Sequence, residues 1–131
     1  QMLSHLDYVG VLTIEFFAVG DELLANEFAP RVHNSGHLTI EGSRTSQFEN
    51  HLRAILDLPL GDVSPLGHAG MLNLIGSMPP KDIVLDSDTV FLHDYGKMPR
   101  PGRKLGHITV VASGPAERDS ALARLNEILI S

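Results

Sequence analysis

Two glutamates in neighbouring apolar runs are the first candidates for chemistry. Glu15 lies in the run Val11–Ala18, Glu27 lies in a second run, and Gly20-Asp21 between them is typical of a hairpin turn. Antiparallel pairing centred near Asp21 makes the glutamates direct cross-strand neighbours, with Cβ atoms roughly 5 Å apart. Carboxylates that close repel each other unless a cation or a shared proton lies between them. Because Mg²⁺ prefers oxygen ligands and keeps waters or phosphate oxygens, the pair predicts a Mg²⁺ site.

A short polar loop follows the second glutamate. Within five positions it presents Arg31, His33, Asn34 and Ser35. A lone surface glutamate or loop histidine is usually solvated, but a register-matched pair of carboxylates beside an arginine and a histidine favours a functional site. The spacing of His33 and His37 would also suit zinc. With no evident third ligand and no obvious helix, zinc is the weaker interpretation.

A hairpin and a helix must position these residues. The hairpin face opposite the glutamates carries large apolar side chains and Asn26, and suits a core. Ser46 and Glu49 have capping-box spacing and begin a helix predicted to run to about Leu58, before Pro59. The apolar sets are Leu12, Ile14, Phe16, Leu24 and Phe28 for the hairpin, and Phe48, Leu52, Ile55 and Leu56 for the helix.

The second half reads as strands closed by a helix. The segment Pro59–Gly67 is rich in Pro and Gly, which predicts one domain over residues 1–60 and another over 61–131. Four of the ten basic residues lie in Lys97–Lys104, a loop whose glycine and proline favour a phosphate site over a merely solvated loop. His107, in a strand, is expected to be packed. The predicted elements are strands at Ala69–Ile75, Thr89–Tyr95 and Leu105–Ala112, a short helical turn at Lys81–Asp88, and a helix beginning at Pro115 with Leu122, Leu125, Ile128 and Leu129 on one face.

Composition limits the remaining function classes. The 131 residues carry a formal net charge of −6 and no cysteine, so neither a general nucleic-acid binder nor a thiolate site is expected. No apolar run approaches the ~18 residues of a membrane span. We therefore expect a cytoplasmic protein without nucleic-acid or membrane partners. The start, Gln1–Leu6, resembles the last turns of a helix, and we expect the sequence to be a C-terminal fragment.

Two long motifs stand out in the chain. The first is Glu27-x-Ala29-Pro30-Arg31-x-His33-Asn34-Ser35-Gly36 with Thr45-Ser46-Gln47-Phe48-Glu49-x-His51-Leu52-Arg53, and the second is Tyr95-Gly96-Lys97 with Arg100-Pro101-Gly102-Arg103-Lys104-Leu105-Gly106-His107. In these motifs the sequence is similar to N5-carboxyaminoimidazole ribonucleotide synthetase, the ATPase subunit of phosphoribosylaminoimidazole carboxylase, an ATP-grasp family of purine synthesis. The motifs stand in the family's order, and the resemblance covers nearly the whole chain.

The resemblance implies a role for each matched residue. Glu15 and Glu27 match the ligands of the Mg²⁺, or Mn²⁺, that holds the ATP phosphates. Arg31, His33 and Asn34 match positions that handle bicarbonate and the carboxylated product. Ala29 stands where many other ATP-grasp enzymes carry an asparagine ligand. Because the members that act in purine synthesis share this departure, the resemblance implies that two carboxylates suffice. Lys97 and Arg103 match the positions that hold the 5′-phosphate of the ribonucleotide. Ser35, Arg100 and Lys104 are further candidate site residues.

The implied activity is the ATP-dependent carboxylation of 5-aminoimidazole ribonucleotide with bicarbonate through carboxyphosphate, by a homodimer. The implied fold is α+β: the C-terminal half of an ATP-grasp large lobe, then a small β-rich domain with a terminal helix. One rival is the formate-using glycinamide ribonucleotide transformylase, whose comparable loop reads His-Asp-Thr-Gly, where this chain has His33-Asn34-Ser35-Gly36. The other is a substrate-binding and assembly fragment without activity, since the isolated chain lacks the lobe that clamps adenine.

Overall fold

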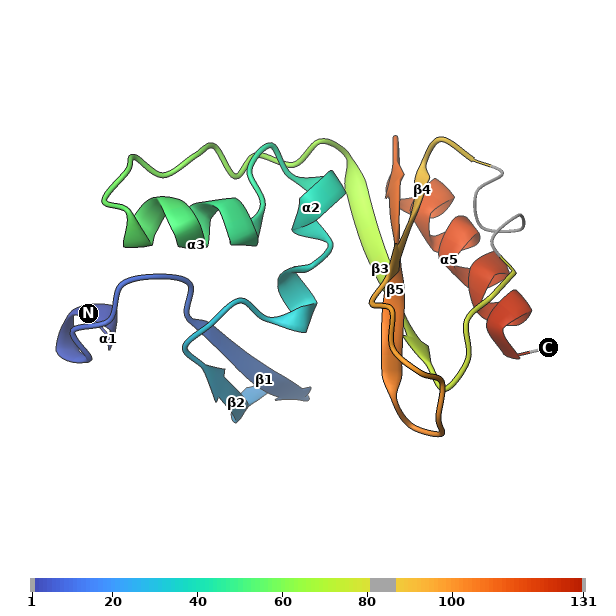
Figure 1. Ribbon diagram of the computed structural model, residues 1–131, viewed down its shortest axis with the longest axis horizontal. Helices are drawn as coiled ribbons and strands as arrows, with labels where there is room; N and C mark the ends of the chain where they lie inside the picture. The colour runs from blue at the N-terminus through green and yellow to red at the C-terminus, as the bar shows by residue number, and fades with distance from the viewer. Residues whose placement is uncertain (1, 81–86, 131) are drawn as a thin grey trace.

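The computed structural model describes residues 2–80 and 87–130 (Figure 1). It has the predicted α+β fold, with a two-stranded antiparallel sheet followed by a three-stranded antiparallel sheet in the order β3-β5-β4. The predicted helical turn at Lys81–Asp88 falls largely on residues 81–86, outside the described part of the chain. In chain order the elements are α1 (Met2–His5), β1 (Thr13–Val19), β2 (Glu22–Ala29), η1 (Asn34–Gly36), α2 (Thr39–Gly42), α3 (Gln47–Ile55), β3 (His68–Ile75), β4 (Val90–Asp94), β5 (Lys104–Ala112) and α5 (Pro115–Ile130).

Strands β1 and β2 form a hairpin with a two-residue turn at Gly20-Asp21. Gly20 has a φ of +60°, which suits the first central position of a type II′ turn. Beside the turn Val19 pairs with Glu22, whereas a centre at Asp21 would pair it with Leu23. The predicted register is therefore wrong by one residue there. A β-bulge next to Glu15 then takes up one extra residue, Asn26, and returns Glu15 to its place opposite Glu27.

The hairpin has no buried face within the described residues. Its strands contact mainly each other, and large apolar side chains on both faces are about half exposed. The prediction that the face opposite the glutamates forms a core is therefore wrong for this chain, because no described element packs on it; only its inner end, at Leu12 and Ile14, is partly buried. The exposed apolar side chains of the two strands are Phe16, Phe17, Val19, Leu23, Leu24 and Phe28.

Helix α3 begins as its sequence predicts and ends earlier. The Ser46 side chain accepts a hydrogen bond from the Glu49 backbone N–H at 3.2 Å, which is the predicted N-cap. The helix ends at Ile55 rather than near Leu58, because Asp57 adopts a left-handed conformation with φ +54°. Backbone bonds from Asp57 to Ala54 and from Leu58 to Arg53 complete a Schellman motif.

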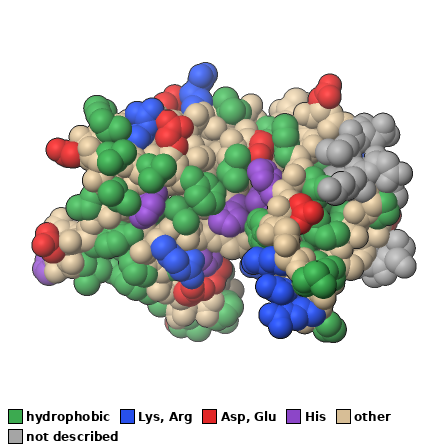
Figure 2. All heavy atoms as spheres, in the orientation of Figure 1, with side chains coloured by type: hydrophobic (Ala, Val, Ile, Leu, Met, Phe, Trp, Pro, Cys, Tyr) green, Lys and Arg blue, Asp and Glu red, His purple; other side chains and the backbone are tan. Residues whose placement is uncertain are grey.

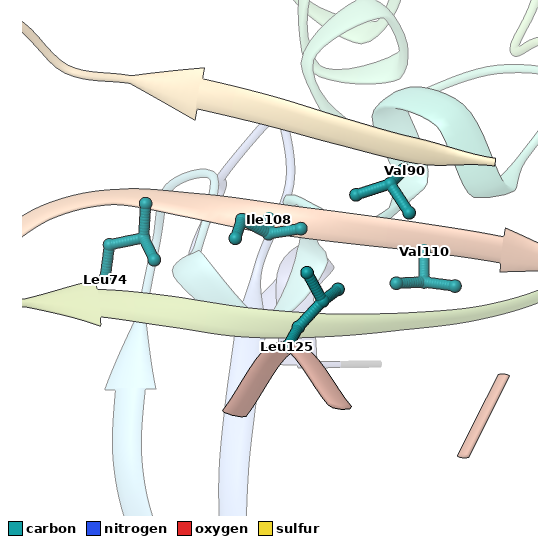
Figure 3. Close-up of a cluster of buried hydrophobic side chains, with 5 residues drawn as sticks. All are labelled: Leu74, Val90, Ile108, Val110 and Leu125. Carbon is teal, nitrogen blue, oxygen red and sulfur yellow. The ribbon is translucent and has the colours of Figure 1, made fainter. Parts of the chain in front are cut away.

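The second half encloses the main hydrophobic core. Strand β5 lies in the centre of its sheet, and α5 begins at Pro115 as predicted and covers one face. Side chains from all three strands and from α5 converge on that face (Figure 3). Full burial of each such aliphatic side chain contributes about 1.5–3 kcal/mol. The core residues are Leu74, Val90, Ile108, Val110 and Leu125, with the predicted Leu122 and Leu129 packed against them.

The opposite face of the same sheet meets the first half of the chain. Figure 1 shows α2 on that side, and α2 contacts both β3 and β5. A β-bridge joins Ser43 to Pro65, with flanking backbone bonds, so the segment after α3 is tied back to the end of α2. The division into domains at residue 60 stays a prediction. Within the described residues, no helix is long and apolar enough to cross a membrane.

Candidate functional site

The two glutamates are direct partners across the hairpin, as predicted. Glu15 pairs with Glu27 in the β1–β2 register. The bulge residue Asn26 donates from Nδ2 to Oε2 of Glu15 at 2.8 Å. The prediction that Asn26 points to the opposite face is therefore wrong, because the bulge turns its side chain toward Glu15. The result is a small group of oxygen atoms near the base of the hairpin, half exposed on the Glu27 side.

The Glu27 carboxylate connects the hairpin to the polar loop. Its Oε1 lies 3.2 Å from Nη2 of Arg31, and its Oε2 lies 3.4 Å from Nε2 of His33. The Arg31 side chain is 58% exposed and also donates to the backbone carbonyl of Val32. A carboxylate, a guanidinium and an imidazole thus meet within ion-pair distance. This group can bind an anion, order a cation and exchange a proton.

His33 is held in place by Gln47 and Ser35. Gln47 brackets the His33 backbone, accepting from its N–H at 3.0 Å and donating to its carbonyl at 2.7 Å. Nδ1 of the ring faces the Ser35 hydroxyl at 2.9 Å, which leaves Nε2 toward Glu27. Because of this packing His33 is only 8% exposed, whereas the Arg31 side chain is open to solvent. Gly36 makes room for Gln47, since a Cβ at that position would collide with the amide.

One basic residue of the second motif reaches the polar loop. Lys104 donates from Nζ to Oδ1 of Asn34 at 2.9 Å, across 70 residues of sequence. Nζ of Lys97 lies 5.0 Å from the centre of the Tyr95 ring, and Arg103 donates to the carbonyl of Met98 at 3.3 Å. Figure 2 shows basic side chains gathered at the edge of the second half that faces the hairpin, across a notch in the surface.

Three histidines fill the contact between α2 and the sheet. His93 and His107 stack with ring centres 4.3 Å apart, and His37 lies 5.4 Å from His107. Burial, then the neighbouring His93 and His37, lower the pKa of His107 to about 4, so it is neutral at pH 7. Burial, followed by the charge of Lys104, also lowers the pKa of His37. His93 bonds instead to Glu41 of α2 at 2.7 Å.

A metal at this site would rely on the glutamate pair. In the described part of the chain, no group of three or more Asp, Glu, His or Cys side chains is arranged to hold a metal ion. Glu15 and Glu27 nevertheless offer hard carboxylate oxygens from adjacent strand positions. That donor set fits Mg²⁺ or Mn²⁺ when phosphate oxygens and waters supply the remaining positions. It does not fit a closed zinc site.

Sequence reasoning missed the residues that support the site. Gln47 and Tyr95 stand inside the two motifs, but nothing in their spacing indicates that one brackets His33 and that the hydroxyl of the other lies 2.8 Å from Nδ1 of His107. His93 carried no signal at all. The one available hint was the number of histidines, seven in 131 residues, without a zinc pattern.

Two family models match the two halves of the chain. Residues 1–48 match the ATP-grasp domain, and residues 69–121 match the phosphoribosylaminoimidazole carboxylase C-terminal domain. The hairpin with its glutamate pair lies in the first match, and the basic segment lies in the second. The class defined by fold and site is therefore an ATP-grasp protein whose C-terminal domain is of the phosphoribosylaminoimidazole carboxylase type.

Individual relatives identify the family. The chain is 52% identical over 128 residues to N5-carboxyaminoimidazole ribonucleotide synthase of Pseudomonas aeruginosa, covering 98% of this chain and 35% of the relative. The synthase of Vibrio parahaemolyticus is 49% identical over 96% of this chain and 33% of its own length. The chain belongs to the N5-carboxyaminoimidazole ribonucleotide synthase family, of which it covers the end of the ATP-grasp domain and the C-terminal domain. It spans about a third of the length of these curated relatives.

Solved structures agree with this placement. The N5-carboxyaminoimidazole ribonucleotide synthetase of Thermus thermophilus superposes with a TM-score of 0.91 at 59% identity, over 97% of this chain and 35% of that one. The enzyme of Aspergillus clavatus, solved in complex with ADP and 5-aminoimidazole ribonucleotide, gives 0.84 at 39% identity, over 93% of this chain and 35% of that one.

Proposed function

We propose that this chain carries two half-sites for the ATP-dependent carboxylation of 5-aminoimidazole ribonucleotide. One half-site is the glutamate pair with Arg31 and His33, and the other is the basic segment Lys97–Lys104. The observation that carries the proposal is the contact between them: Lys104 of the second motif bonds to Asn34 of the first at 2.9 Å. The names of the relatives, and a relative solved with ADP and 5-aminoimidazole ribonucleotide, support the same reaction.

In this proposal, Glu15 and Glu27 hold the divalent metal that accompanies ATP. The metal, when bound, offsets the negative charge that develops on the transferring phosphoryl group. Arg31 pairs with Glu27 at 3.2 Å. If Glu27 binds a metal ion, the exposed Arg31 guanidinium can exchange the Glu27 carboxylate for a substrate anion. A guanidinium can bind two oxygens of bicarbonate or of carboxyphosphate at once.

The reaction has two bond exchanges. A bicarbonate oxygen attacks the γ-phosphorus of ATP, and the bond to the β-phosphate oxygen breaks, giving carboxyphosphate and ADP. The substrate amine then attacks the carboxyl carbon, and the carbon–oxygen bond to phosphate breaks. The proton lost by the amine must be taken up nearby. In this proposal Nε2 of His33 takes it up, with the Nδ1–H group donating to the Ser35 hydroxyl at 2.9 Å and the backbone of His33 clamped by Gln47.

The basic segment holds the far end of the substrate. A ribonucleotide carries a dianionic phosphate several ångströms from its reacting amine, so the two ends need separate binding groups. Lys97 and Arg103 supply the cations, with Arg100 and Lys104 as further candidates, and the Ser35 hydroxyl is a candidate neutral contact. Fixing both ends converts an encounter of three reactants into a reaction of positioned groups, which is a large part of the rate gain.

The two rival functions, a formate-using reaction and an inactive binding fragment, predict different results in an assay of ADP release. The test is ADP release by a full-length synthase carrying this chain, with bicarbonate or formate and with or without ribonucleotide. We expect release that needs bicarbonate and ribonucleotide. Glu27→Gln should lower the rate of ADP release by about 100-fold or more. Mutating residues that merely hydrogen-bond to metal ligands already lowers metal affinity or activity by about 10–100-fold. The matched control is Glu22→Gln, an exposed glutamate on the same strand. Formate-dependent release, or equal activity in both variants, would refute the assignment.

A further inference from the structure

The interface between α2 and the sheet contains buried polar atoms that have no hydrogen-bond partner among the described residues. They are side-chain atoms of five residues, and each belongs to the polar loop, to α2 or to the sheet face that meets them. Buried polar groups without partners are costly, so each calls for an explanation. The atoms are Asn34 Nδ2, Glu41 Oε2, Asn73 Oδ1, His107 Nε2 and Thr109 Oγ1.

We infer that Asn34, Tyr95 and His107 form a directional hydrogen-bond chain, running from Lys104 to Asn73, that positions Lys104 and the polar loop for substrate. Its first link is fixed by chemistry, because a lysine ammonium can only donate. Lys104 donates to Oδ1 of Asn34 at 2.9 Å, so the Asn34 amide must present Nδ2 on its other side. That atom is a donor without a partner.

The next link is the Tyr95 hydroxyl. It lies 2.8 Å from Nδ1 of His107. Burial raises the pKa of Tyr95, and the Asn34 amide beside the phenol lowers it by a smaller effect. Nδ2 of Asn34 is thus close to the phenol oxygen but lacks full hydrogen-bond geometry. A small rotation of the amide would let Nδ2 donate to the Tyr95 oxygen, and the hydroxyl proton would then go to His107.

The last link fixes the tautomer of His107. The ring is 1% exposed and neutral, so one nitrogen carries the proton and the other accepts. If Tyr95 donates to Nδ1, the proton is on Nε2. One of the two cross-strand partners of His107 is Asn73, whose Oδ1 is an acceptor without a partner in the described part of the chain. Thr109, whose Oγ1 is another of these buried atoms, lies two residues along the same face.

In this hydrogen-bond chain every group donates in the same direction. The arrangement gives partners to two donors, Asn34 Nδ2 and His107 Nε2, and to one acceptor, Asn73 Oδ1. It also joins the two motifs, since Asn34 belongs to the first, and Tyr95, Lys104 and His107 belong to the second. Asn34, Tyr95 and His107 are positioning residues, because they act on substrate through Lys104 and the loop. This kinetic consequence rests on the proposed function, whereas the tautomer does not.

The structural part is tested on the 131-residue chain with ¹⁵N-labelled histidine. Long-range proton–nitrogen spectra report which imidazole nitrogen is protonated, and a His107→Asn variant assigns the signal. We expect the Nε2–H tautomer for His107, and a changed Nδ1 signal in Tyr95→Phe. Tyr8→Phe is the matched control, because that hydroxyl bonds to the carbonyls of Val11 and Pro30 instead. An Nδ1–H tautomer, or no response to Tyr95→Phe, would overturn the chain.

The kinetic part uses a full-length synthase carrying this chain. Tyr95→Phe should raise KM for the ribonucleotide about tenfold and leave KM for ATP unchanged, because Lys104 and the polar loop would lose the support that orients them toward the ribonucleotide. His107→Leu should behave like Tyr95→Phe. His107→Asn should stay near wild type, because its amide oxygen can replace Nδ1 as acceptor. Equal increases in both KM values, or equal effects of the two His107 variants, would refute positioning. If the turnover of the wild-type enzyme did not depend on the ribonucleotide, the proposed function would be refuted, while the tautomer measured in the spectra would still stand.

Discussion

Lowering the pH from 7 to 5 should lower the free energy of unfolding of this chain. His107 is neutral in the folded state with a pKa of about 4, against 6.5 for an ordinary histidine. The unfolded chain therefore binds more protons at this residue between pH 6.5 and 4, and stability falls as the pH is lowered through that window. Linkage over this interval gives a loss of about 2 kcal/mol between pH 7 and 5 from His107 alone. His37, whose pKa is also lowered, adds in the same direction.

The two carboxylates with lowered pKa values affect stability mainly at lower pH than His107 does. The lowered pKa values of Asp62 and Glu117, caused mainly by hydrogen bonds from Ser64 and Ser113, remove stability only as pH falls below the ordinary values of 3.8 and 4.5. The assay is urea unfolding of the chain, followed by circular dichroism at pH 7, 6 and 5. His107→Asn cannot titrate, so its free energy of unfolding should lose about 2 kcal/mol less over the same range. His68→Asn, at an exposed site, is the control. Parallel pH profiles for wild type and His107→Asn would refute a buried neutral His107.

Three further predictions test separate parts of the structure. Gly106→Ala should cost about 1–3 kcal/mol or more in urea unfolding, because its Cβ would collide with the backbone carbonyl of His93 on β4; unchanged stability would contradict the β4–β5 pairing. The isolated chain should bind ATP weakly or not at all, since its exposed site supplies only part of a nucleotide pocket, and calorimetric binding in the micromolar range would contradict this. In a full-length synthase, Arg103→Ala should raise KM for the ribonucleotide on the order of tenfold with KM for ATP unchanged, while Arg118→Ala, on α5, changes neither; equal effects on both substrates would make the basic segment a solvated loop.

Local chemistry made most elements predictable. Ser46 caps α3 and Pro115 begins α5, because both roles depend on one residue and its immediate neighbours. The partnership of Glu15 with Glu27 was also predictable, but for an incomplete reason. The turn alone would have offset the pair, and the bulge at Asn26 corrects the offset. A bulge inserts one unpaired residue into the ladder, and its position does not follow from the spacing of residues about the turn.

The support of the site could not be predicted, because it joins distant segments. Glu41 meets His93 across 52 residues, and Lys104 meets Asn34 across 70. Neither contact follows from periodicity, which reports which face a residue occupies and not what covers it. The early end of α3 had a local cause that was overlooked: Asp57 takes the left-handed position usually given to glycine.

The most direct test of the proposed reaction follows an oxygen atom. If a bicarbonate oxygen attacks the γ-phosphorus, that oxygen stays with phosphorus when the amine displaces phosphate. A full-length synthase carrying this chain, supplied with ¹⁸O-labelled bicarbonate, ATP and 5-aminoimidazole ribonucleotide, should therefore release phosphate with one ¹⁸O atom, measured by ³¹P NMR. Unlabelled phosphate formed alongside carboxylated product would contradict bicarbonate activation by ATP, and with it the role proposed for the glutamate pair and its neighbouring loop.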